Sequence, residues 1–151
     1  MPTAYLALKV VHILLVAAAL GSNFTYGVWF ARANAHPGFA ATALRGIKFI
    51  DDWIANPAYV LLLPTGAAMA YIGGLSFRVH WIEWAMGLWA IAILAGFFGY
   101  SPTLRAQIHA VDRAGVDSEA AKELAVRGQI WAAFLGVVVL AIVVLMVFKP
   151  A

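Results

Sequence analysis

A single histidine lies inside a long stretch of uncharged apolar residues close to the start of the chain. His12 falls within the run from Val10 to Val16, which has the composition of a membrane-spanning helix. An ionisable side chain is costly to keep in hydrocarbon, so its presence marks a candidate functional site. A neutral imidazole can bind a metal ion or heme iron through one ring nitrogen. It can also serve only as a hydrogen-bonding strut between helices, and both interpretations of His12 stay open.

Other side chains with ligand chemistry occur toward the same end of the predicted helices. Thioether sulfur suits heme iron and Cu(I), and carboxylate oxygen also binds metals. We therefore predict a site for a b-type heme, with copper as the alternative, in which His12 is one ligand. The further candidate ligands are Met69, Met86, Met146 and Glu83. The alternatives are that the methionines fill the core and that Glu83 reaches the outer surface or pairs with Lys9.

A seam of three- and four-residue steps places Lys9, His12, Asn23 and Tyr26 on one helical face. Lipid cannot satisfy imidazole or amide groups, so this face is predicted to point into a helix bundle.

At the other end of the predicted helices, the adjacent carboxylates Asp51 and Asp52 are candidate site residues. They can equally be surface charges that face Arg45 and Lys48.

The composition places the chain in a membrane. Its 151 residues are 64% hydrophobic and 11% charged, with a mean hydropathy of +0.88, whereas soluble domains are about a quarter charged. Four apolar segments approach the ~20 residues that a helix needs to cross the hydrocarbon. They cover about residues 4–30, 56–73, 81–100 and 130–148. We predict one all-α domain over residues 1–151, a four-helix transmembrane bundle of up-down-up-down topology.

The distribution of basic residues predicts the orientation. Seven of the ten lie between the first and second or between the third and fourth segments, which places both loops in the cytoplasm and both termini in the periplasm. We expect a multi-pass protein of a bacterial inner membrane. A cleaved signal peptide over the first segment is the competing interpretation, but Met1 to Leu8 carries no basic side chain. The chain has no cysteine, so thiolate metal sites are excluded.

Small and helix-breaking residues predict packing and boundaries. Gly66 and Ala70 form a small-residue pair that should meet a neighbouring helix, and Glu83, Gly87 and Ala90 align on one face of the third segment. We further expect a loop over residues 33–38, a break or kink at Ser101 before Pro102, and a helix end at Gly115 followed by a cap at Asp117 or Ser118.

Several short motifs resemble an uncharacterised bacterial family of integral membrane proteins with a domain of unknown function. They are Lys9-Val10-Val11-His12, Asp52-Trp53, Pro64-Thr65-Gly66, Gln107 and the closing Leu145-Met146-Val147-Phe148-Lys149-Pro150. That family is distantly similar to copper-resistance protein D and to the membrane-bound protoporphyrinogen oxidase of bacterial heme synthesis. The oxidase carries a first-helix histidine in a Lys-x-x-His setting that is associated with heme, so the resemblance implies heme binding at His12.

No specific reaction follows from these residues, and no enzymatic activity is assigned. Besides binding of heme or another redox-active metal group, two functions stay open: a small-molecule or copper transporter, and a structural helper subunit of a larger membrane complex. The expected surroundings are a lipid bilayer, with a homo-oligomer or a larger complex as further partners. No basic patch with interleaved aromatic residues points to nucleic acid.

Overall fold

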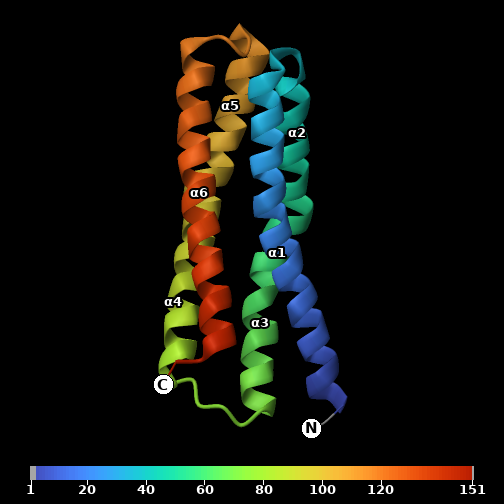
Figure 1. Ribbon diagram of the computed structural model, residues 1–151, viewed down its shortest axis with the longest axis vertical. Helices are drawn as coiled ribbons and strands as arrows, with labels where there is room; N and C mark the ends of the chain where they lie inside the picture. The colour runs from blue at the N-terminus through green and yellow to red at the C-terminus, as the bar shows by residue number, and fades with distance from the viewer. Residues whose placement is uncertain (1–2, 151) are drawn as a thin grey trace.

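The computed structural model describes residues 3–150 and is all-helical over that range (Figure 1). Four long helical segments lie side by side, and two of them are assembled from consecutive α- and π-helices. The elements are α1 (Thr3–Ala35), η1 (Pro37–Phe39), α2 (Ala40–Ile50), η2 (Asp51–Ala55), α3 (Asn56–Ile72), α4 (His80–Leu94), η3 (Ala95–Tyr100), α5 (Ser101–Ala114) and α6 (Glu119–Phe148). The all-α prediction is confirmed, and each long helix begins before the span predicted for it.

Connections between the long helices lie at alternating ends of the molecule in Figure 1. The turns at residues 36–39 and 115–118 are at the upper end, whereas the 73–79 link lies at the lower end, near the two ends of the chain. In the lower half the main contacts pair α1 with α3 and α4 with α6. In the upper half α2 packs against α1 and α5, and α5 packs against α6.

The turns follow local sequence signals. Gly115 ends α5 with a φ of 83°, and the Ser118 hydroxyl caps α6 by accepting from the Ala121 N–H at 3.3 Å, as predicted. The predicted 33–38 loop is largely wrong, because α1 continues to Ala35 and only His36 separates it from η1. Pro37 disfavours the α conformation in His36, which takes a φ of −135° and a ψ of 86°.

Both π-helices directly precede an X-Pro dipeptide. Asn56-Pro57 follows η2 and Ser101-Pro102 follows η3, with each proline at the second position of the next α-helix. A proline inside a helix lacks the N–H donor and its ring crowds the carbonyl four residues earlier. The wider π turn takes up this mismatch, so the chain runs on without a break. The irregularity expected at Ser101 therefore lies just before it.

A buried hydrophobic cluster lies in the upper and middle part of the bundle, where all four long helices contribute. Its residues are Tyr26, Phe30, Leu44, Ile47, Ala55, Ala92, Tyr100, Leu104, Leu135 and Val138. Beside this cluster, the Trp131 indole packs directly on Gly99 in η3.

Gly99→Ala is expected to lower the free energy of unfolding by about 2 kcal/mol, the order of overpacking penalties in cores. A Cβ at Gly99 would lie 2.7 Å from two atoms of the rigid Trp131 ring, so the ring or η3 must move. Gly96→Ala is the matched control, because no atom outside its own helix lies within 4 Å of that Cβ. Thermal unfolding in detergent measures both, and equal midpoints would contradict the close contact.

Candidate functional site

His12 on α1 contacts α3 in two ways: it forms a hydrogen bond with Thr65, and its ring packs on Gly66. Its Nδ1 lies 2.8 Å from the Thr65 hydroxyl, and a Cβ built on Gly66 would lie 3.2 Å from His12 Cε1. Gly66 thus leaves the room in which the imidazole ring packs. His12 and Thr65 are 53 residues apart in the sequence. Their contact brings together the Lys9–His12 motif and the Pro64–Gly66 motif.

The Thr65 hydroxyl determines which His12 nitrogen carries the proton. Its single proton has a close acceptor in the Leu61 carbonyl at 2.7 Å, so the hydroxyl accepts from His12 Nδ1–H. His12 Nε2 then keeps its lone pair. Histidines that bind metals donate their other ring N–H in this way, which fixes the ring and the tautomer.

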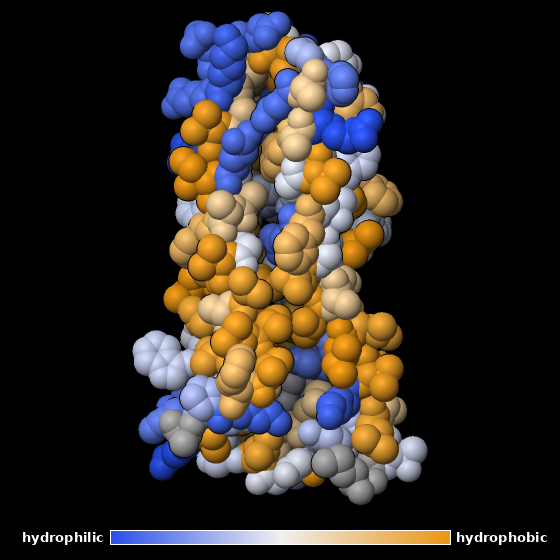
Figure 2. Space-filling view, in the orientation of Figure 1, coloured by the Kyte–Doolittle hydropathy of each residue, from blue (hydrophilic) through white to orange (hydrophobic). Residues whose placement is uncertain are grey.

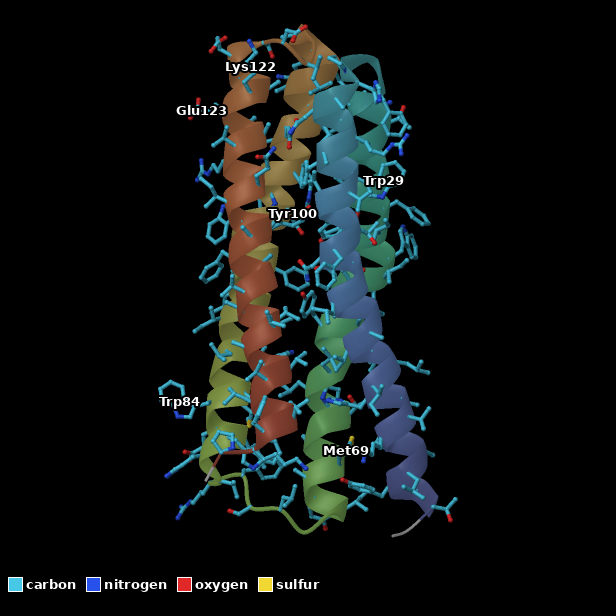
Figure 3. All side chains as sticks on the ribbon, in the orientation of Figure 1. Trp29, Met69, Trp84, Tyr100, Lys122 and Glu123 are labelled. Atoms are coloured by element: carbon cyan, nitrogen blue, oxygen red, sulfur yellow. The ribbon has the colours of Figure 1, made fainter. Side chains whose placement is uncertain are left out.

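Of the three candidate methionines, Met69 lies on the helix pair that holds His12. It follows Thr65 by four residues and so lies one turn along the same face of α3, and Figure 3 shows its side chain on the side of α3 toward α1. Met86 on α4 is 41% exposed and Met146 on α6 is 37% exposed.

The charged candidates of the lower half lie on the outside. Glu83 and Lys9 are both exposed, and no ion pair joins them among residues 3–150. The face of Glu83, Gly87 and Ala90 points outward, because α4 buries the apolar residues Ile82 and Ala85 instead. Within the described residues no three His, Asp or Glu side chains come together as a metal site.

A second polar site lies at a small cavity that residues of both π-helices line. Asp51, the first residue of η2, is 4% exposed. Its Oδ2 accepts hydrogen bonds from the Ser101 hydroxyl at 2.5 Å and from the Asn56 amide at 3.3 Å. Ser101, 1% exposed, directly follows η3. The Asp51–Ser101 bond therefore joins the second long helix to the third.

Two tyrosines complete this site. The rings of Tyr26 and Tyr100 stack with centroids 5.6 Å apart, and Figure 3 shows Tyr100 toward the interior of the bundle. Both residues are at most 3% exposed, and neither hydroxyl has a hydrogen-bond partner among the residues that the structure describes. Tyr26, Tyr100 and Asp51 line one cavity of about 10 Å³, which has room for about one water molecule.

The remaining predicted polar residues divide between interior and surface. Asn23 donates to the Tyr59 hydroxyl at 2.6 Å, so His12 and Asn23 share the face that meets α3, as predicted. Asp52 is exposed and forms an ion pair with Lys48, as expected of a surface charge. The side chain of Asp51 instead points toward Ser101 and accepts a hydrogen bond from its hydroxyl.

Burial governs the ionisation of Asp51. Loss of hydration raises the pKa of its carboxyl above the ordinary value, while the Ser101 hydroxyl, the Lys48 ammonium and the Asn56 amide pull it down. The neighbouring charge of Asp52 adds to the upward shift.

Sequence reasoning missed Thr65, Ser101 and the tyrosines as site residues. Hydroxyl residues in apolar segments are individually unremarkable, and their partners lie 50 or more residues away along the chain. A usable signal was the pair of X-Pro dipeptides, because each stands next to a π-helix that contributes to the Asp51 site.

Comparison with known families agrees with the apolar helices. Within residues 3–150, three helices are long and apolar enough to cross a membrane: Thr3–Ala35, His80–Ala114 and Glu119–Phe148. Residues 6–150 match the family described as "Predicted integral membrane protein (DUF2269)". The chain belongs to this family of integral membrane proteins, which confirms the resemblance to an uncharacterised membrane family. The further similarity to copper-resistance protein D and protoporphyrinogen oxidase stays a prediction. No curated protein and no solved structure matches the chain.

Proposed function

We propose that the chain crosses a bacterial inner membrane four times, with both termini in the periplasm. The second long helix supplies the fourth span through α3, which is 17 residues long and contains two prolines. On the face that Figure 2 shows, hydrophobic residues predominate across the middle and lower part of the molecule, and hydrophilic residues gather at the upper end and again near the lower end. The upper end carries Arg45, which pairs with Asp112 at 2.7 Å, together with most of the other basic residues. The positive-inside rule favours the cytoplasm for this end.

We further propose that the protein binds a redox-active metal group, a b-type heme or a copper ion, through Nε2 of His12. The observation that supports this best is the donation from Nδ1 to Thr65, because it orients the ring and leaves Nε2 basic. When bound, the group would supply one-electron redox chemistry. The chain's own part is to hold the imidazole and to keep water from it.

Packing around His12 limits where the group can bind. The ring lies directly on Gly66, so no porphyrin fits between α1 and α3 at that level. A heme would have to lie on the Nε2 side of the ring, outside this contact. A copper ion needs far less room, and the Met69 thioether one turn away is a suitable second ligand for Cu(I).

Absorption spectra and copper content test this proposal on protein purified from cells supplied with heme precursor and copper. A Soret band that shifts on reduction would identify heme, whereas bound copper without that band would identify copper. His12→Ala is expected to abolish either signal, because the ligand nitrogen is gone. His80→Ala is the matched control, since His80 is exposed at the same end of the molecule, and it should keep the signal.

Further substitutions distinguish a ligand from a structural strut. Met69→Leu should weaken copper binding or shift the reduced spectrum, and Met86→Leu should change neither. A colourless, metal-free wild type would refute metal binding and favour a structural subunit. His12→Ala would then cost only about 1 kcal/mol of stability, the order of intramembrane hydrogen bonds.

A further inference from the structure

We propose that Asp51 is a buried proton-binding site, built beside the two π-helices together with Ser101, Tyr26 and Tyr100. The proposal does not depend on a metal group at His12. The proton comes from water, forms an O–H bond on the Asp51 carboxylate, and returns to water on release, with no electron transfer.

Burial is the first argument. A carboxylate that is 4% exposed loses most of its hydration, and a purely structural position is served as well by an amide or an apolar residue. Asp51 is also not part of the neighbouring ion pair, in which Lys48 bonds to the exposed Asp52. Among residues 3–150, the carboxylate of Asp51 thus has two neutral hydrogen-bond donors and no ion pair with a basic side chain.

The chemistry of the surrounding groups is the second argument. A carboxylate that is always ionised needs only hydrogen-bond donors around it. A carboxylic acid that is always protonated needs an acceptor for its O–H. Ser101, Tyr26 and Tyr100 present hydroxyls, which either donate or accept by rotating the O–H bond. When Asp51 is ionised, the Ser101 hydroxyl donates to Oδ2. When Asp51 is protonated, its own O–H can donate to a hydroxyl or to water in the cavity, so both states are satisfied.

The two phenols without partners are the third argument. Buried hydroxyls nearly always find a hydrogen bond, yet those of Tyr26 and Tyr100 have none among the described residues. Both tyrosines line the same water-sized cavity as Asp51. A water there would connect the phenols to the carboxylate and provide a path for the proton.

Several elements contribute charged or titratable groups near Asp51. The first helix contributes Tyr26, α2 contributes Lys48, and η2 contributes Asp52. On the other side α3 contributes Tyr59 and η3 contributes Tyr100. The cavity lining from α4 and α6 is apolar, with Ala92, Ile93 and Leu135. Asp51 is therefore the buried carboxyl among these groups, and burial raises its pKa above the ordinary value.

Infrared difference spectra of the protein in lipid nanodiscs test the proposal. As the pH falls from well above to below the ordinary aspartate pKa of about 3.9, the wild type should gain a carboxylic C=O band at a pH above that of the surface acids. The band should be absent in Asp51→Asn and present in Asp52→Asn, which changes the adjacent exposed carboxylate. A wild type without such a band, or a band that persists in Asp51→Asn, would overturn the proposal.

Thermal stability against pH gives a second measurement. The folded-state pKa of Asp51 lies above its unfolded value, so its contribution is fully present at low pH and is lost as the pH rises through the folded pKa. Asp51→Asn should match the wild type in acid and exceed it at neutral pH, whereas Asp52→Asn should show no such crossover. Parallel curves for wild type and Asp51→Asn would contradict an ionising Asp51.

Ser101→Ala keeps the proposal testable if Asp51→Asn does not fold. Loss of a donor to the ionised form should raise the proton affinity of Asp51 roughly tenfold, as expected for a hydrogen bond to a charged group. An unchanged midpoint in Ser101→Ala would show that the site does not exchange a proton as proposed.

Discussion

Alkaline phosphatase fused after Lys149 is expected to be active, and the same enzyme fused after Ala120 is expected to be inactive. Lys149 follows the lower end of α6, whereas Ala120 lies in its first turn at the upper end. The reporter needs disulfides that form only in the periplasm, so the difference should be close to all or none. Enzyme activity normalised to the amount of fusion protein is the measurement.

Fusions at two further turns serve as controls for this topology. A reporter after Gly74, in the link between α3 and α4, should be active, and one after Gly38, in η1, should be inactive. Activity after Gly74 depends on α3 crossing the membrane despite its two prolines. The reverse pattern at all four sites would show that the protein has the opposite orientation in the membrane. Activity after both Gly38 and Gly74 would show that the second long helix does not cross.

Gly66→Leu is expected to lower the free energy of unfolding by about 3 kcal/mol, at the upper end of the usual overpacking range. Even a bare Cβ at this position lies 3.2 Å from His12 Cε1, so a leucine must displace the imidazole. That displacement also breaks the His12–Thr65 hydrogen bond. Thermal unfolding in detergent and the yield of folded protein measure the effect.

Gly87→Leu is the matched control for this substitution. Gly87 is exposed and nothing outside its own helix lies within 4 Å of its Cβ, so the added side chain meets only lipid or detergent. Similar unfolding midpoints for the Gly66 and Gly87 variants would contradict the tight contact between α1 and α3.

Much of the fold was predictable because its signals are local. The length and hydropathy of the apolar segments indicate helices in lipid, since only internally bonded backbone is stable there. The cap at Ser118 and the glycine end at Gly115 depend on residues within one turn. The predicted seam from His12 to Asn23 needed only the helical repeat. Its direction followed from the cost of exposing imidazole and amide groups to lipid.

The sequence by itself thus determined that this is a helical membrane protein with a polar seam on its first helix. Only the tertiary structure decided which partners that seam meets and which carboxylate is buried. Asp51 and Asp52 are adjacent and chemically identical, yet one bonds to Ser101 on another helix and the other to Lys48 on its own. Successive residues of a helix point to different sides of its axis, and the packing of the helices, together with the π turns before Pro57 and Pro102, determines which direction faces the interior.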